Sequence, residues 1–187
     1  MRIIGGIAKG RTIYTPKGER TRPTADRIKE SVFAIIQDYI PNSRVLDLFA
    51  GSGNMGLEAL SRGAKGCVFI DMDRTSIEVI KKNTINLNFT TQTRVYQSDY
   101  RSALRKLQSR NETFDVIFVD PPYNRGFIQP VVAMIHQMDI LDQNGIIVVE
   151  HSIHETIDTG GIPLQVKDQR KYGITMVSFI AKDVTED

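Results

Sequence analysis

A short motif of an acid, two prolines and a tyrosine follows one of the apolar runs of the chain. The run Phe114–Val119 ends in Asp120-Pro121-Pro122-Tyr123. Proline lacks a backbone N–H and an ionised aspartate only accepts hydrogen bonds, so the segment offers acceptors beside an aromatic ring. An exocyclic base amine needs such acceptors, because its lone pair is delocalised into the base. The motif predicts modification of a base amine, with Tyr123 stacking on a flipped base; a strand-ending proline turn is the plainer alternative.

A glycine-rich turn follows another apolar run, Val45–Ala50. The segment from Gly51 to Gly56 has the spacing Gly-x-Gly-x-x-Gly, which lets the backbone approach a ligand closely and opens a helix with free N–H groups. Asp71 stands 20 residues after Gly51, at the end of the next apolar run, where a carboxylate accepts hydrogen bonds from ribose hydroxyls. We interpret the pair as a nucleoside-cofactor site. Taken alone, the glycine spacing also suits a tight turn between a strand and a helix.

Two further acids bear on which cofactor binds. A nicotinamide dinucleotide fits the glycine turn through its pyrophosphate, but Asp47 within the strand favours a cationic or amino-acid-bearing ligand. A satisfied structural acid is the alternative for Asp47. The segment Ser98-Asp99-Tyr100 ends a third run, where an acceptor and a ring can hold an adenine. An N-cap role for Asp99 explains that segment equally well.

The elements that must position these motifs alternate along the chain. Apolar runs without a polar face predict strands of a parallel sheet covered by helices on both faces. Strands are expected at Val45–Ala50, Cys67–Asp71, Arg94–Ser98, Val116–Asp120 and Ile146–Glu150, and helices at Thr24–Tyr39, Met55–Arg62, Arg74–Asn86, Arg101–Ser109 and Phe127–Met138. Leu164–Arg170 and Thr175–Lys182 leave no room for a crossover helix, so they are expected to form an antiparallel hairpin at one end of the sheet. The predicted fold class is α/β, a doubly wound, mostly parallel sheet with a C-terminal antiparallel hairpin.

The composition is that of one globular domain. The chain has 187 residues, of which 41% are hydrophobic and 25% charged. It has no apolar run near the roughly 18 residues of a membrane span and no secretory leader at its start, so a soluble cytoplasmic protein is expected. Its single cysteine, Cys67, is expected to pack in a strand, and no Cys/His spacing indicates a metal site. His136, His151 and His154 are unclustered and are interpreted as structural, with His151 placed where it could border the pocket.

Positive charge is concentrated near the N-terminus. Residues 1–30 carry eight Lys/Arg against three acids, a balance of +5, and the rest of the chain has 16 basic and 19 acidic residues, a balance of −3. Residues 1–23 are therefore interpreted as a basic arm, part of it a hairpin, that binds a polyanion, and residues 24–187 as the globular domain. A solvated N-terminal extension without a partner is the alternative.

The motifs together resemble the class I S-adenosylmethionine-dependent methyltransferases, which share the DxFxGxG turn, the acid after it and a [DN]PP[YF] motif. More narrowly, RIIGGIAKGR, RPTADRIKESVF, DLFAGSGNMGLEALSRGA, FVDPPY and KYGIT are similar to the bacterial 16S ribosomal RNA guanine-N2 methyltransferase family, over nearly the whole chain. The resemblance implies a Rossmann-like fold with a terminal antiparallel strand. Many members have phenylalanine where this chain has Tyr123, and either ring can stack.

The resemblance also implies a role for each motif residue. Asp47, Phe49, Gly51, Ser52 and Gly53 would surround the methionyl part of S-adenosylmethionine, Asp71 its ribose and Asp99 its adenine, with Asn54, Met72 and Tyr100 beside them. Asp120 and the Pro121 carbonyl would accept hydrogen bonds from the target amine, with Pro122 fixing the backbone and Tyr123 stacking, without a metal. RNA phosphates would lie against Arg2, Lys9, Arg11, Lys17, Arg20 and Arg22, although pairing of Arg22 with a local acid such as Asp26 is simpler.

The sequence thus predicts methylation of the N2 amine of a guanine in 16S ribosomal RNA, naked or within a 30S particle. S-adenosylmethionine is the expected cofactor and S-adenosylhomocysteine the product, and positioning should supply most of the rate. Asp120 favours guanine, which presents N1–H and N2–H donors, over adenine. The alternatives are a DNA adenine-N6 or cytosine-N4 methyltransferase and a non-catalytic RNA-binding relative. A nicotinamide oxidoreductase would leave the Asp-Pro-Pro-Tyr motif unexplained.

Overall fold

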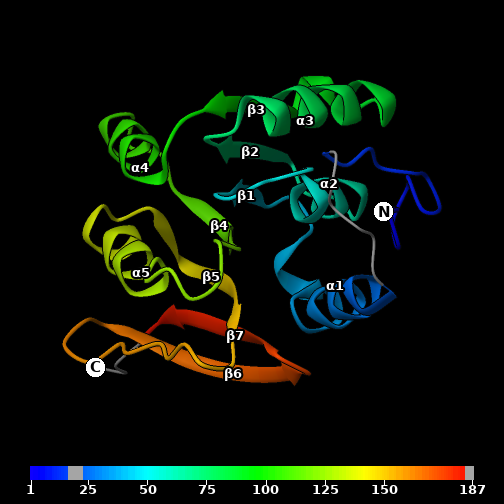
Figure 1. The fold of residues 1–187 in the computed structure, drawn as a ribbon. Coiled ribbons are helices and arrows are strands. Elements are labelled where there is room, and N and C mark those ends of the chain that lie inside the picture. Colours follow the sequence, from blue (N-terminus) through cyan, green and yellow to red (C-terminus); the bar gives the residue numbers. More distant parts are fainter. Residues whose placement is uncertain (17–22, 184–187) are drawn as a thin grey trace.

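A computed structural model describes residues 1–16 and 23–183. Within these residues, seven strands form one sheet in the order β3-β2-β1-β4-β5-β7-β6 (Figure 1). The strands from β3 to β5 are parallel to their neighbours, whereas β7 runs antiparallel to both β5 and β6. The elements in chain order are α1 (Pro23–Ile35), η1 (Gln37–Tyr39), β1 (Arg44–Asp47), α2 (Asn54–Ser61), β2 (Gly66–Asp71), α3 (Arg74–Asn86), η2 (Thr90–Gln92), β3 (Thr93–Gln97), α4 (Tyr100–Ser109), β4 (Phe114–Val119), α5 (Ile128–Gln137), β5 (Leu141–Ser152), β6 (Leu164–Tyr172) and β7 (Thr175–Lys182). The predicted α/β class, with its C-terminal antiparallel hairpin, is confirmed.

The central strands are apolar on both faces because helices cover both. Figure 1 shows α4 and α5 on one side of the sheet and α1 and α2 on the other. Two hydrophobic cores lie on the two faces of the sheet. Phe118 of β4 packs with Phe33 of α1 in one core, and the adjacent Ile117 belongs with Val132 of α5 to the other. Neighbouring side chains of a strand point to opposite faces, so this double burial is what an uninterrupted apolar run requires.

Three predicted boundaries were wrong by three to five residues, the largest error being in β5, which begins at Leu141 and not at Ile146. The first helix ends at Ile35 and not at Tyr39, because Ile36 leaves helical geometry (φ −96°, ψ 14°) and a 3₁₀ turn follows. The tighter turn buries both Ile36 and Ile40. The first strand ends at Asp47, and the chain beyond it already belongs to the glycine turn.

The N-terminal segment, residues 1–16, lies against the domain. Its two ends meet in an antiparallel bridge between Arg2 and Thr12. Ile3, Ala8 and Ile13 are buried and belong to the same core as α1 and α2. This part of the expected basic arm therefore shares the core of the domain instead of projecting from it.

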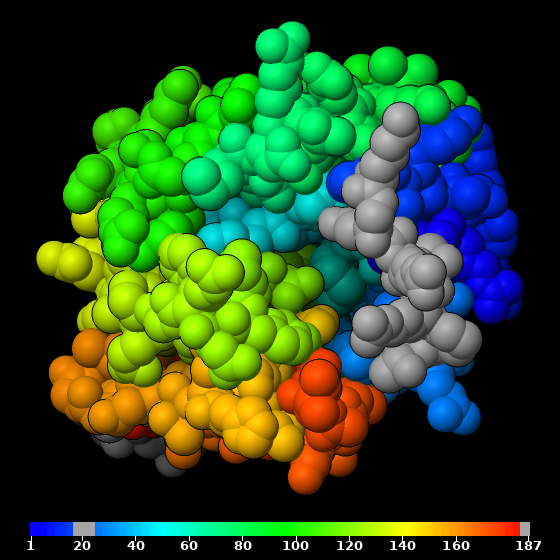
Figure 2. Space-filling view, viewed as in Figure 1, coloured from blue at the N-terminus to red at the C-terminus, as the bar shows by residue number. Residues whose placement is uncertain are grey.

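The carboxyl ends of the parallel strands bring the two sequence motifs to one edge of the sheet. The glycine turn follows β1, and the Asp-Pro-Pro-Tyr segment follows the neighbouring β4. In Figure 2, the cyan glycine turn, the yellow-green segment after β4 and the orange-red turn between β6 and β7 surround a recess. The fold thus gathers at one place the residues that the sequence separates by more than a hundred positions.

Candidate active site

The glycine turn between β1 and α2 is held by two aspartates. Gly51 and Gly53 have positive φ values of 54° and 81°, which residues with a side chain adopt only with strain. The N–H of Gly51 donates to Asp71 Oδ2 at 2.8 Å, and the N–H of Gly56 donates to Asp47 Oδ2 at 3.0 Å. Asp47 is buried, and burial raises the pKa of its carboxyl to about 7. Asp47, expected to touch a cofactor, is thus placed to brace the turn from inside the protein.

Asp71 stands at the carboxyl end of β2, as expected. Its second oxygen, Oδ1, accepts the N–H of Asp73 at 2.9 Å, so the carboxylate is fixed from both sides while remaining half-exposed. A fixed, accessible carboxylate suits the hydroxyls of a ribose. The next residue, Met72, is 73% exposed, so the structure places an apolar side chain at the rim of this position.

The side chains of Ser52 and Asn54 are used within the protein. Ser52 is buried, and its hydroxyl donates to Met1 Sδ at 3.6 Å. Asn54 Oδ1 accepts a hydrogen bond from Lys29 Nζ at 2.7 Å. The glycine turn therefore offers a ligand mainly its backbone and ties its side chains to the N-terminal part of the chain.

Three aromatic rings gather beyond the glycine turn. The ring centroid of Phe49 lies 5.8 Å from that of Tyr100 and 6.0 Å from that of Phe127. Among the described residues, the Tyr100 hydroxyl is the one buried side-chain polar atom without a hydrogen-bond partner. Leaving such a group unpaired costs free energy, so it marks a place that a polar ligand can satisfy. The rings and this hydroxyl fit a polar heterocycle such as adenine.

Asp99, beside this aromatic group, has the role of a helix cap. It is exposed, and its Oδ1 accepts the N–H of Ser102 at 3.0 Å at the start of α4. The same hydrogen bond lowers the pKa of Asp99, so its carboxylate is charged at neutral pH. Of the two interpretations left open by the sequence, the structure shows the N-cap.

The Asp-Pro-Pro-Tyr segment leaves β4 at the edge of the sheet. Asp120 is exposed, Pro121 is buried and Pro122 is exposed again. The hydroxyl of the half-buried Tyr123 donates to Glu150 Oε1 at 2.5 Å and lies 3.2 Å from Thr175 Oγ1. Burial and the neighbouring Glu150 raise the pKa of Tyr123, so its hydroxyl stays protonated and its ring stays anchored.

Glu150 is the site residue that sequence reasoning missed. It lines the same small hollow as Asp120, whose apolar walls include Val32 of α1, Met55 of α2 and Val177 of β7. Burial raises the pKa of Glu150, and the hydrogen bond from Tyr123 opposes the shift. One signal in the sequence could have found it: the apolar run Ile146–Glu150 ends in an acid, as the run Val116–Asp120 does.

The basic side chains of the N-terminal segment differ in their surroundings. Arg2 forms an ion pair with Asp26 at 3.3 Å, the guanidinium of Arg11 donates to the carbonyl of Asn86, and Lys9 is exposed. Three further predicted RNA-binding residues lie outside the described residues: Lys17, Arg20 and Arg22. The sequence suggested Arg22 as the partner of Asp26, whereas in the structure Asp26 pairs with Arg2.

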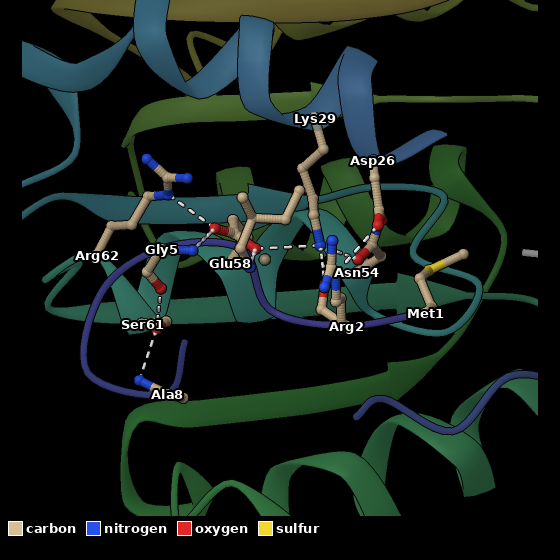
Figure 3. Close-up of polar contacts among 12 residues, drawn as sticks. Met1, Arg2, Gly5, Ala8, Asp26, Lys29, Asn54, Glu58, Ser61 and Arg62 are labelled. Carbon is tan, nitrogen blue, oxygen red and sulfur yellow. Dashed lines mark hydrogen bonds and ion pairs between the residues drawn. The ribbon is translucent and has the colours of Figure 1, made fainter. Parts of the chain in front are cut away.

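The N-terminal segment is fastened to α2 by a buried carboxylate (Figure 3). Glu58 accepts the N–H groups of Ile4 (2.9 Å) and Gly5 (2.8 Å). It also pairs with Lys29 Nζ at 3.1 Å and Arg62 Nε at 2.8 Å. Lys29 in turn donates to the Arg2 carbonyl at 2.5 Å. The two buried charged groups, Lys29 and Glu58, thus find their hydrogen-bond partners within the protein, which is the condition for burying charge.

The remaining titratable candidates are structural. Cys67 is buried in β2, and His151 is buried with its ring nitrogens near Ser178 Oγ (2.8 Å) and the Ser152 carbonyl (3.0 Å). No cluster of three His, Cys, Asp or Glu side chains within residues 1–16 and 23–183 is arranged to hold a metal ion. None of the helices in the described part of the chain has the length and apolar character of a membrane span.

Comparison with known proteins places the chain among methyltransferases. The model of the family described as "Conserved hypothetical protein 95" matches residues 1–181. A Bacillus subtilis (strain 168) protein named "Putative rRNA methyltransferase YlbH" is 38% identical over 97% of this chain and 99% of its own length. "Ribosomal RNA small subunit methyltransferase D" of Haemophilus influenzae is 37% identical over 80% of this chain and 78% of its own. The solved structure "Putative methyltransferase yhhF" from Escherichia coli, 31% identical, superposes with a TM-score of 0.84 over 98% of both chains.

Proposed function

The chain belongs to the family described as "Conserved hypothetical protein 95", and on this premise we propose that it transfers a methyl group from S-adenosylmethionine to the N2 amine of a guanine in 16S ribosomal RNA. Relatives that cover most of the chain are named ribosomal RNA methyltransferases. The observation that carries the proposal is the meeting of the glycine turn with Asp120 and Tyr123 at one edge of the sheet. In this proposal S-adenosylmethionine, the methyl donor, binds at the glycine turn, and the target guanine binds at Asp120 and Tyr123.

The residues around the glycine turn fit S-adenosylmethionine. Asp71 offers a fixed carboxylate to the ribose, and the unpaired Tyr100 hydroxyl lies among rings that suit the adenine. Phe49, Gly51 and Gly53 would lie along the methionyl part, with the backbone of Ser52 and Asn54 and the side chain of Met72 at the rim. Asp47 would hold the turn in shape. When bound, this cofactor supplies an electrophilic methyl group on a sulfonium and leaves as S-adenosylhomocysteine.

The protein's part in the reaction is to orient the amine. Asp120 and the Pro121 carbonyl would accept hydrogen bonds from the two N2–H groups, which localises the nitrogen lone pair and aims it at the methyl carbon. Tyr123 would stack on the base, and Pro122 would keep the backbone rigid. As the carbon–nitrogen bond forms, N2 gives up one proton to Asp120 or to water. Alignment of the reacting groups, without a covalent intermediate, would provide most of the acceleration.

Binding of the RNA would involve the basic N-terminal part. We assign the basic side chains of residues 1–23 to RNA contact, while buried apolar side chains of residues 1–16 pack in the core of the methyltransferase domain. Among the described basic residues of this part, Lys9, Arg2 and Arg11 are all exposed and can meet phosphate, and Lys17, Arg20 and Arg22 complete the set in sequence. The proposed substrate is 16S ribosomal RNA, naked or assembled into a 30S particle, and the proposed location of the protein is the cytoplasm.

A methyl-transfer assay with radiolabelled S-adenosylmethionine tests this function. Unmethylated 30S particles, naked 16S RNA and duplex DNA are offered in parallel, and nucleoside digestion identifies the product. The expected product is N2-methylguanosine from ribosomal RNA. The Asp120→Ala variant should lose roughly 100-fold or more of the rate because the amine loses an acceptor. Asp38→Ala, an exposed acid in the 3₁₀ turn, is the matched control and should retain the rate.

The other outcomes separate the alternatives. Label in DNA adenine or cytosine would overturn the substrate and keep the chemistry. RNA binding without transfer, unchanged in Asp120→Ala, would indicate a non-catalytic relative. A nicotinamide dinucleotide that binds in place of S-adenosylmethionine would refute the methyltransferase proposal.

A further inference from the structure

Asp120 and Glu150 lie at matching levels near the carboxyl ends of two neighbouring parallel strands: Asp120 directly follows β4, and Glu150 lies two residues before the end of β5. The register of β4 and β5 pairs Phe118 with Val148 and Val119 with Val149. The next residues along the chain are Asp120, after β4, and Glu150, in β5, and both residues line one hollow. Residues at matching positions of adjacent parallel strands point to the same face. The site therefore presents a pair of acids, of which the proposed reaction has used one.

Glu150 is fixed through one of its oxygens. The Tyr123 hydroxyl donates its one hydrogen bond to Glu150 Oε1 at 2.5 Å. Thr175 Oγ1, 3.2 Å from the tyrosine oxygen, must therefore be the donor in the second hydrogen bond. Within the described residues, no hydrogen bond to the other oxygen, Oε2, is present. A carboxylate that is mostly buried, held at one oxygen and unpaired at the other is prepared to receive a donor from a ligand.

We propose that Glu150 determines the choice of base, by accepting the N1–H of the target guanine while Asp120 accepts from its N2 amine. This inference rests on the proposed function, since it concerns the base that the same site takes. The Watson–Crick edge of guanine carries two neighbouring donors, N1–H and N2–H, which match two neighbouring acceptors. Adenine carries an acceptor at N1, so its lone pair would face the carboxylate.

The arrangement also explains why Tyr123 is anchored as it is. Its hydroxyl holds Glu150 by Oε1, so Oε2 is the oxygen that remains for a base in the hollow. The tyrosine ring and the Glu150 carboxylate are thereby fixed relative to each other, one for the face of the base and the other for its edge. A phenylalanine at this position would still stack but would leave the carboxylate without this donor.

A base analogue tests the role of Glu150. 2-Aminopurine keeps the amine at C2, lacks the O6 oxygen and has an acceptor at N1 in place of the N1–H, so the change of ratio in a Glu150 variant is the readout specific to N1. Ligated 16S RNA carries either guanosine or 2-aminopurine riboside at the nucleotide that the wild-type protein methylates, and kcat/KM is measured on both. The wild-type protein should prefer guanosine by about 10- to 100-fold, because the analogue places two acceptors face to face.

The Glu150→Gln variant should relax this preference. The amide oxygen can still accept the hydroxyl proton of Tyr123, and the amide N–H₂ then faces the base as a donor to N1 of 2-aminopurine. The ratio of kcat/KM between guanosine and 2-aminopurine should fall by about tenfold or more. Tyr123→Phe removes the hydroxyl that fixes Glu150, so it should lower the rate on guanosine and reduce the ratio as well. Glu78→Gln, an exposed acid on α3, should change neither.

The outcomes distinguish failure of this inference from failure of the proposed function. If the wild-type protein methylates no guanine in ribosomal RNA, the proposed function fails. If it methylates guanine and 2-aminopurine at equal rates, Glu150 does not select the base. This result needs only the wild-type protein, so it holds even if Glu150→Gln fails to fold. An unchanged ratio in a folded Glu150→Gln protein, checked by thermal unfolding, would overturn the inference as well.

Discussion

Removal of the buried Glu58 carboxylate should destabilise the protein more than removal of its lysine partner. In Glu58→Leu the N–H groups of Ile4 and Gly5 lose their acceptor, and Lys29, which is 1% exposed, loses its counter-charge. Breaking a buried pair from one side costs about 3–5 kcal/mol, which for a chain of this size lowers the unfolding temperature by roughly 6–20 °C. In Lys29→Met, by contrast, Glu58 keeps Arg62 and both backbone donors. That variant should lose about 1–3 kcal/mol.

The pH dependence of the Glu58→Leu defect identifies its cause. Burial lowers the pKa of Lys29 below its ordinary value, and the Glu58 carboxylate counteracts this shift. Without Glu58, the pKa of the buried lysine falls further, so the folded protein releases the proton at a pH at which the unfolded chain still holds it. Stability then rises with pH between the lowered folded pKa and the ordinary value of 10.5. Because the pKa of Lys29 is lowered less in the wild type, the defect should be largest near neutral pH and shrink with rising pH until the wild-type lysine also releases its proton.

Urea unfolding of the wild type, both single variants and the double variant at pH 6, 7.5 and 9 measures these effects. The double variant Lys29→Met/Glu58→Leu should be more stable than Glu58→Leu alone, because it removes the uncompensated charge. Glu78→Leu, which breaks the exposed pair with Arg74, should be nearly neutral. The reasoning is refuted if Lys29→Met costs more than Glu58→Leu, or if the Glu58→Leu defect does not change with pH.

Two further predictions concern the glycine turn. Asp47→Asn keeps an acceptor for the Gly56 N–H but removes a carboxyl whose pKa burial raises from 3.8 to about 7. The contribution of that carboxyl is full below about pH 4 and is lost as the pH rises through 7. Between pH 5 and 8 the variant should therefore lose less stability than the wild type in urea unfolding, and equal losses would contradict this. Gly53→Ala places a Cβ 3.2 Å from the Phe69 ring at a φ of +81°, so it should cost about 1–2 kcal/mol and weaken S-adenosylmethionine binding in calorimetry; Gly10→Ala, at +85° in open space, should leave binding unchanged.

The sequence predicted the parts of the site that are local in the chain. The glycine turn and the Asp-Pro-Pro-Tyr segment each follow a strand directly, so an apolar run and the residues after it were enough to place them at one edge. Glu150 was not predicted, because an acid at the end of a strand gains meaning only when the neighbour and register of that strand are known. The Val119 and Val149 pairing that supplies this information joins residues 30 positions apart.

The packing of the N-terminal segment against the domain could not be predicted from the sequence either, because it also depends on contacts between distant residues. Its charge balance indicates a polyanion partner, and that charge says nothing of where the backbone lies. What holds the backbone is Glu58, an acid inside a helix, whose partners come from residues 4, 5, 29 and 62. Local periodicity places Glu58 on a helix but does not reveal that the carboxylate is buried.

The antiparallel direction of β7 is what lets the C-terminal hairpin complete the site. Because β7 runs against β5, its first residues lie at the carboxyl edge, where Thr175 pairs with Ser152 and Val177 with Glu150. Thr175 thereby reaches the Tyr123 hydroxyl, and Val177 lines the hollow below Glu150. A parallel strand would bring its last residues to this edge and would need a crossover before it. The contact between the hydroxyls of Tyr172 and Ser31 also fastens the hairpin turn to α1, so this end of the hairpin is held by both β5 and α1.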